Sequence, residues 1–349
     1  MSRRWLGSAA DRPQNWNRRE LLSASGVVVA GASLGALATS GCRPDPRPRV
    51  CVAKAASYGI DLEPVFREAL TEVGWGAERV RGKKFLLKPN LVETSRGAAQ
   101  INTHPMVVRA VALALYGAGA KEVVIGEGPG HRRDTLLVLE ESGLAEVLVQ
   151  EKLRFVDLNR QPGFAVANAG NLSGLVRLTL PAVLEEVDTV VSIAKLKTHH
   201  WAGVTLSMKN LFGIMPGSYY GWPKNVLHLA GLLESILDIN ATVRSELAIV
   251  DGIVGMEGDG PILGTAKSAG VVVVGTNPVA VDASAARVMG VAPERVRYLA
   301  KAAGWLGPLG ESEILQVGEE IADVATPFEL VEKIPAQKAL LDRDSGAQY

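Results

Sequence analysis

Cysteine, aromatic residues and an excess of either charge are all scarce in this chain of 349 residues. Its two cysteines are too few for an iron–sulfur cluster held by four thiolates or for a framework of disulfides, so both classes are excluded. Aromatic residues make up only 5%. Basic and acidic residues number 37 each, which leaves no basic excess for a phosphate backbone and excludes a nucleic-acid partner.

The remaining composition is that of an ordinary folded protein. Apolar residues account for 47% and charged residues for 21%, which excludes disorder or coiled coil as the dominant state. The 37 glycines indicate many tight backbone turns. We find no internal repeat, and the length suits one large domain or two modest ones.

Residues 1–42 are expected to be an export signal. Arg18 and Arg19 stand just before an apolar stretch that runs from Leu21 to Ala38 and is diluted by glycine and serine. A membrane-spanning helix needs roughly 20 strongly apolar residues, which this stretch lacks. Paired arginines followed by a mild apolar segment resemble the twin-arginine signal of bacteria. The alternative is a soluble helix with an accidental arginine pair.

The end of this signal allows two outcomes. Cleavage after Ala38 fits a signal-peptidase site, whereas Thr39-Ser40-Gly41-Cys42 resembles a lipobox, with Thr39 in place of the usual leucine, and would give Cys42 a lipid anchor. Residues 43–49 are rich in proline and predict a stiff tether. Without lipidation, Cys42 and Cys51 are candidates for a disulfide. We therefore expect the twin-arginine export machinery as a partner, and a periplasmic or envelope-anchored location.

The mature chain alternates strand and helix patterns. Short apolar runs predict strands at residues 50–53, 85–87, 121–125, 176–180, 189–194, 247–250 and 271–274. Helical spacing of apolar residues, with proline or glycine at the ends, predicts helices at 62–73, 105–115, 226–239, 278–289 and 295–303. Residues 201–220 predict loops with a short helix. This rhythm favours an α/β fold with a mostly parallel central sheet and flanking helices, with its main domain over 50–310 and a peripheral segment over 311–349.

Polar side chains gather just after the predicted strands, where α/β folds bind their ligands. Lys88 and Asn90 suit an anion, or else a solvated lysine and a turn. His104 precedes a helix, where it suits either acid–base chemistry or a helix cap. The Gly-rich residues 126–130 match neither a Walker loop nor a dinucleotide fingerprint.

The segment from Lys195 to His200 carries the most information. Lys195 and Lys197 lie on the same face of a strand, and two such charges repel unless carboxylates or an anionic substrate neutralise them. Four carboxylates are candidates to pair with these lysines, to act as a general acid or base, or to bind a cation: Asp251, Glu257, Asp259 and Asp282. His199 and His200 are adjacent and do not form a zincin motif, so the sequence leaves open whether the chain binds a divalent metal. Lys209 and Asn210 add a second lysine–asparagine pair.

In order and spacing, these motifs resemble the DUF362 family over about residues 50–290. The motifs that carry the resemblance are Lys88-Pro89-Asn90, Thr103-His104-Pro105, residues 195–199, residues 209–213, Asp251-Gly252 with Gly260-Pro261, and residues 277–282. The family name records an undefined function. Many members carry ferredoxin-type cysteines, which this chain lacks, so an electron-transfer role does not carry over. The resemblance implies an exported member without the ferredoxin module.

Three functions follow as hypotheses. The leading one is an exported enzyme for a small anionic substrate, with His104 or His199 moving a proton and with Asp251 and Glu257 orienting these bases. The set expected to bind the substrate or a cation is Lys88, Asn90, Lys195, Lys197, Lys209, Asn210 and Asp282. The alternatives are a non-catalytic binding lipoprotein for a metabolite or metal complex, and a metal-dependent redox or maturation partner.

Overall fold

A computed structural model describes residues 47–341, except residues 95, 131 and 132. The expected export signal, Cys42, the first part of the tether and His131 lie outside the described residues. From Arg47 onward the chain forms one compact unit. Among the described residues, none of the helices combines the length and the apolar character that crossing a membrane requires.

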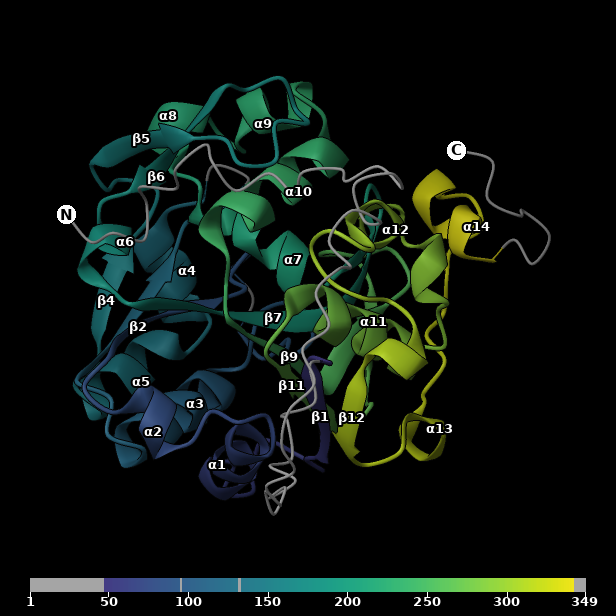
Figure 1. Ribbon diagram of the computed structural model, residues 1–349, viewed down its shortest axis with the longest axis horizontal. Coiled ribbons are helices and arrows are strands. Elements are labelled where there is room, and N and C mark those ends of the chain that lie inside the picture. The colour runs from purple at the N-terminus through teal and green to yellow at the C-terminus, as the bar shows by residue number, and fades with distance from the viewer. Residues whose placement is uncertain (1–46, 95, 131–132, 342–349) are drawn as a thin grey trace, which may run out of the picture. The chain divides into compact units, whose positions relative to one another are not determined.

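The unit is an α/β fold, as expected (Figure 1). Its strands are β1 (Arg49–Lys54), β2 (Lys84–Pro89), β3 (Glu122–Glu127), β4 (Arg154–Asp157), β5 (Gly163–Ala167), β6 (Arg177–Pro181), β7 (Thr189–His199), β8 (Gly203–Thr205), β9 (Leu247–Glu257), β10 (Thr265–Lys267), β11 (Val271–Gly275) and β12 (Leu315–Gly318). Its helices are α1 (Glu63–Glu72), α2 (Ala77–Val80), α3 (Pro105–Gly117), α4 (Thr135–Glu141), α5 (Leu144–Gln150), α6 (Val183–Glu186), α7 (Ser207–Asn210), η3 (Leu211–Ile214), α8 (Gly217–Tyr220), α9 (Asn225–Leu229), α10 (Leu232–Val243), α11 (Pro278–Val288), η4 (Pro293–Arg295), α12 (Arg297–Ala302), η5 (Glu311–Glu313), α13 (Ile321–Val324) and α14 (Pro335–Leu341).

The central sheet has ten strands, eight of them in the order β12-β1-β11-β9-β7-β2-β3-β4. The run from β9 to β4 is parallel throughout, and β12 is parallel to β1. β11 is antiparallel to both of its neighbours, and β8 and β10 add short antiparallel pairs. The expected strand at 176–180 is β6, which pairs with β5 in a separate two-stranded sheet.

Helices cover both faces of the sheet, which explains why its central strands are apolar on both sides. Phe66 of α1 and Val111 of α3 pack with Leu87, Val191 and other residues on one face. On the opposite face the Ser192 hydroxyl donates to the Ser207 carbonyl at the start of α7. The core therefore lies in two layers on either side of the sheet.

Several boundaries differ from the sequence-based expectation. The helix expected at 226–239 is two helices, α9 and α10, because Gly231 adopts a φ of +104° between them. β7 continues to His199 and β9 to Glu257, so residues 195–199 and Asp251 lie within strands and not in the loops after them. The segment after residue 310 supplies the edge strand β12 and the buried Gln337, which bonds to the Gly258 carbonyl.

Candidate functional site

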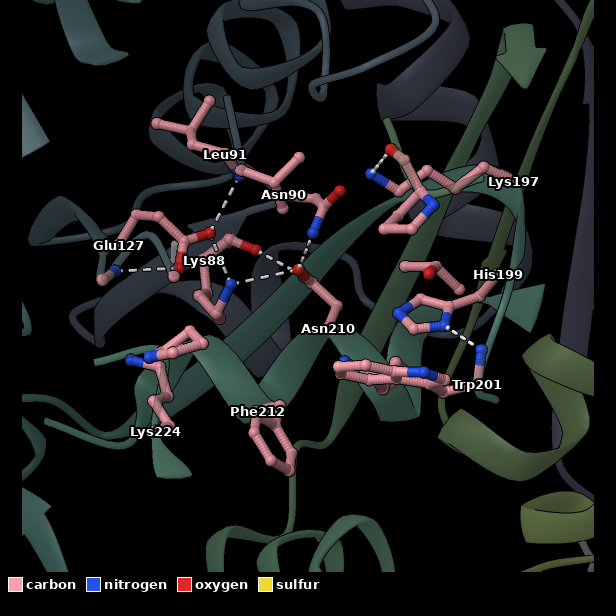
Figure 2. Close-up of a pocket in the computed structure, with 18 of the residues that line it drawn as sticks. Lys88, Asn90, Leu91, Glu127, Lys197, His199, Trp201, Asn210, Phe212 and Lys224 are labelled. Atoms are coloured by element: carbon pink, nitrogen blue, oxygen red, sulfur yellow. Dashed lines mark hydrogen bonds and ion pairs between the residues drawn. The ribbon is translucent and has the colours of Figure 1, made fainter. Parts of the chain in front are cut away.

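A cavity with a volume of about 100 Å³ lies beyond the carboxyl ends of β2, β3 and β7. Parallel neighbouring strands end at the same edge, so residues from three distant segments meet there. Figure 2 shows Lys88, Glu127 and Asn210 on one side and Lys197, His199 and Trp201 on the other. Its polar and aromatic lining is Lys88, Asn90, Glu127, Lys197, His199, His200, Trp201, Thr205, Lys209, Asn210, Phe212, Lys224 and His228.

One wall of the cavity is a buried ion pair. The Lys88 ammonium donates to the Glu127 carboxylate at 2.6 Å and to Asn210 Oδ1 at 3.0 Å. Glu127 also accepts from the backbone N–H groups of Leu91 and Gly128. Burial lowers the pKa of Lys88, while Glu127 opposes that shift. All hydrogen-bonding groups of this pair have partners, so it forms a rigid base for the site.

Three further lysines reach the cavity without a carboxylate partner among the described residues. Lys197 is fully buried and donates to the carbonyls of Ile101 and Pro261. Lys224 donates to Asn159 Oδ1 and to the Met215 carbonyl. The Lys209 ammonium lies 4.7 Å from the centre of the Phe212 ring and has no hydrogen-bond acceptor within the described ranges.

The environment of these lysines disfavours their charged form. Burial lowers the pKa of Lys209 to about 8, with Lys88 adding to the shift, and lowers the pKa of Lys224 to about 7. Burial also places the pKa of Lys197 well below its usual value, and neighbouring lysines lower it further. Among the described lining residues, four are lysines and one is acidic. An anion would therefore be stabilised here by charge.

His199 is held as a neutral hydrogen-bond donor. Its Nδ1 accepts from the backbone N–H groups of Trp201 and Ala202, so the proton of the neutral ring resides on Nε2. Burial, together with Lys209, His200 and Lys197, keeps the pKa of His199 well below its usual range. Nε2 points away from Trp201 into the cavity (Figure 2). This geometry favours donation to a ligand over abstraction of a proton.

Three of the expected groups, Lys195, Asp251 and His104, lie in a second cluster with Tyr58, apart from the cavity lining. Lys195 and Asp251 form a fully buried ion pair at 2.6 Å. The Tyr58 hydroxyl is 3.0 Å from both Asp251 Oδ1 and the Lys195 ammonium, and the His104 ring stacks on Tyr58 at 3.7 Å. His104 also caps α3, with Nδ1 accepting from Met106, and burial lowers the pKa of His104 to about 4. Lys195 thus has its counter-charge, whereas Lys197 does not.

Two expected carboxylates support the backbone outside the cavity lining. Asp282 accepts from the Ser207 and Met208 N–H groups and from the Ser207 hydroxyl, which anchors α7 and thereby Lys209 and Asn210. Burial raises the pKa of Asp282 to about 7. Glu257 lies at the end of β9, where it pairs with Lys267 and accepts from the Glu329 N–H.

The sequence assigned no role to some residues of the site. Glu127 was noted only as part of a Gly-rich loop, although a carboxylate at the end of a buried strand is itself a signal. Lys224 follows Trp222-Pro223 and adopts a φ of +68°. No sequence pattern predicts this backbone conformation. His228 reaches the cavity through α9, at 5.1 Å between its ring centre and that of Phe212.

No group of three or more histidine, cysteine or acidic side chains in the described part of the chain is arranged to hold a metal ion. Cys51, the only cysteine in that part, is a buried free thiol, and burial raises its pKa to about 11.

Comparison with known proteins places this site within a family. The chain is 30% identical over 208 residues to the thylakoid-associated protein sll1697 of Synechocystis, a match that spans 58% of this chain and 61% of that protein. Two solved structures, each 17% identical, also match. One is a Thermotoga maritima protein, with a TM-score of 0.37 over 56% of this chain and 50% of its own.

The other is the lactate racemase apoprotein of Thermoanaerobacterium thermosaccharolyticum, with a TM-score of 0.39 over 62% and 52% of the two chains. A family match covers residues 85–287, more than half of the chain, and includes Lys88, Glu127, His199 and Asp282. The chain therefore belongs to the family described as Domain of unknown function (DUF362).

Proposed function

We propose that this protein is an enzyme that holds a small organic anion in the strand-end cavity and moves a proton on it. The observation that carries the proposal is the imbalance of charge around one small cavity, where four lysines face a single carboxylate. Because Glu127 is already paired with Lys88, Lys197, Lys209 and Lys224 have no carboxylate partner among the described residues, and a bound anion would favour their protonated forms. A cavity of about 100 Å³ admits a molecule on the order of seven to ten non-hydrogen atoms, since one water needs ~10–15 Å³.

Two groups suit the chemistry. Lys209 has an amine without a hydrogen-bond acceptor and a pKa of about 8, so a fraction of it is neutral near pH 7 and serves as a general base. His199 offers Nε2–H as a fixed donor that stabilises negative charge developing on the ligand. In this arrangement a C–H bond next to the carboxylate breaks: its proton passes to Lys209 Nζ, and its electron pair moves into the carboxylate group. His199 Nε2–H stabilises the charge that develops there, while Lys197 and Lys224 hold the carboxylate.

Binding is tested by titration calorimetry with acetate and propanoate at pH 7. Lys209→Met and Lys197→Met should each weaken binding at least tenfold. Lys54→Met removes the same charge from an exposed surface pair and should leave binding unchanged. Equal binding by all three variants would refute the assignment of the cavity.

Proton transfer is tested separately by incubating each acid with the protein in D₂O and following its C–H signals by proton NMR. Exchange that disappears in Lys209→Met supports an enzyme. Binding without exchange in the unmodified protein would instead support the binding-protein hypothesis.

We also propose that the chain is exported through the twin-arginine route and resides in the cell envelope. The arginine pair and the Cys42 segment support this proposal, and β1 begins only at Arg49, so cleavage at either expected position leaves every described element whole. Replacing Arg18 and Arg19 by lysine should retain the protein in the cytoplasm of a bacterial host. Cys42→Ser should abolish lipid labelling if Cys42 is the anchor.

A further inference from the structure

One oxygen of the cavity lining is an acceptor without a donor. Asn90 is 6% exposed, and its Oδ1 has no hydrogen-bond partner among the described residues. In Figure 2 its amide nitrogen meets Asn210, while the oxygen points to the opposite side. A buried polar atom left unpaired costs on the order of 1–3 kcal/mol, so its chemical identity matters.

The hydrogen-bond network determines which atom of Asn90 is the oxygen. Asn210 Nδ2 lies 3.0 Å from the Lys88 carbonyl, which can only accept, so the Asn210 amide orientation is settled. Asn210 Oδ1 therefore accepts, from Lys88 Nζ and from Asn90 at 3.2 Å. The Asn90 atom that faces it has to be the NH₂ group. The other Asn90 atom is thus an acceptor-only oxygen.

A second unpartnered atom lines the same cavity. The Thr205 side chain is buried in β8, and its Oγ1 has no partner within the described ranges. A hydroxyl both donates and accepts, so Thr205 accommodates either kind of ligand group. Asn90 Oδ1 restricts the ligand more than Thr205 Oγ1 does, because only a hydrogen-bond donor can pair with it.

An anionic group alone cannot meet this requirement. Carboxylate oxygens only accept, so they match the lysines and His199 Nε2–H but leave Asn90 Oδ1 without a donor. A ligand that displaces solvent from the cavity therefore needs a donor of its own. An ammonium group is disfavoured because four lysines surround the cavity, whereas a hydroxyl donates without adding charge.

From this geometry we infer that the ligand is a small hydroxycarboxylate whose hydroxyl donates to Asn90 Oδ1 while its carboxylate meets the lysines. The inference rests on the proposed function and specifies its substrate class. A capacity of about seven to ten non-hydrogen atoms matches a monohydroxy acid of about four to seven carbons, and a three-carbon hydroxy acid, with about six such atoms, also fits.

Titration calorimetry on the unmodified protein tests the inference with four probes of nearly equal size: propanoate, 2-hydroxypropanoate, 3-hydroxypropanoate and alanine. At least one hydroxy acid should bind tenfold or more tightly than propanoate, and alanine should bind more weakly than that hydroxy acid. This comparison needs no variant, so it does not depend on the folding of a mutant.

Two variants then test whether Asn90 causes the preference for a hydroxy acid over propanoate. Asn90→Leu should bring the hydroxy acid and propanoate to within about threefold of each other. Asn240→Leu is the matched control, because Asn240 is also buried and also has an unpartnered Oδ1, but lies outside the cavity lining. That variant should retain the full preference.

The possible failures are distinct. If propanoate and both hydroxy acids bind equally, and Lys209→Met weakens all three, the hydroxyl inference is overturned and the anion site stands. Tighter binding of alanine than of both hydroxy acids also overturns it. If none of the acids binds, the proposed function itself is refuted, and the inference falls with it.

Discussion

The two ion pairs Lys195–Asp251 and Lys54–Glu319 have the same N–O distance of 2.6 Å but opposite surroundings. The first is fully buried, whereas the side chains of the second are 64% and 35% exposed. At 2.6 Å two unit charges attract by about 6 kcal/mol at an effective dielectric constant of 20, and by about 1.6 kcal/mol in bulk water. Asp251→Asn and Glu319→Gln therefore break geometrically equal pairs with unequal consequences.

We expect Asp251→Asn to lower the free energy of unfolding by about 3–5 kcal/mol at pH 7, because it leaves the Lys195 ammonium buried without a counter-charge. The loss has an upper bound, since Lys195 can instead give up its proton. From a reference pKa of 10.5, that costs about 5 kcal/mol at pH 7 and about 2 kcal/mol at pH 9. A loss of about 3–5 kcal/mol at pH 7 should therefore shrink by about 1–3 kcal/mol by pH 9. Glu319→Gln should cost under ~1 kcal/mol.

Urea denaturation followed by tryptophan fluorescence at pH 7 and pH 9 measures both effects. The double variant Lys195→Met/Asp251→Asn removes the unpaired charge and should recover at least ~1 kcal/mol relative to Asp251→Asn alone. A loss below ~1 kcal/mol at pH 7, or a loss that is the same at both pH values, would show that the pair does not hold a buried charge, and would refute the reasoning.

Three further outcomes are expected. Anion affinity measured by calorimetry should be highest below pH 7 and fall above pH 8. The reason is that the pKa values of Lys224 and Lys209 are about 7 and 8, and only the protonated lysines attract the ligand. An affinity that does not change between pH 6 and pH 9 would contradict this. Gly213→Ala should weaken anion binding at least tenfold, because a methyl group there would lie 2.7 Å from the Lys88 ammonium and collide with Glu127; unchanged binding would argue against a rigid wall. The pKa of Asp282 is raised from 3.8 to about 7, so the folded state retains a proton that the unfolded state releases. Its contribution to stability is therefore present below pH 4 and lost as the pH rises through 7. Asp282→Asn should remove a slope of up to about 1.4 kcal/mol per pH unit in urea denaturation between pH 4.5 and 6.5, and an unaltered slope would count against the shift.

The fold class followed from the sequence because its signals are local. Short apolar runs bounded by glycine and proline predicted the parallel strands, and polar residues after Leu87 and Ile125 marked the ligand edge. The direction of β11 and the pairing of β12 with β1 depend on contacts between distant segments, which local periodicity does not report. The split at Gly231 shows the same limit, since one glycine with positive φ interrupts an otherwise continuous apolar pattern.

The candidate site was predicted in part, for a related reason. Lys88, Asn90, Lys197, His199, Lys209 and Asn210 all line the cavity. Lys195 and Lys197 are two positions apart in one strand, yet the register shifts between them, and only Lys195 meets Asp251. Such a shift separates the two lysines into two clusters. No spacing rule reveals it before the neighbouring strand is placed.

The position of β1 determines when the central sheet can be completed during synthesis of the chain. Cys51 lies opposite Val274 in β11 and opposite Val317 in β12, so both partners of the first strand are synthesised more than 200 residues after it. While the ribosome is still elongating the chain, β1 has neither of these strands to pair with. This edge of the sheet closes only when translation is nearly complete, and such distant contacts form slowly. Until β12 has been synthesised, the apolar residues of β1 lack the strand that covers them, so this edge of the sheet is the last part of it that can form.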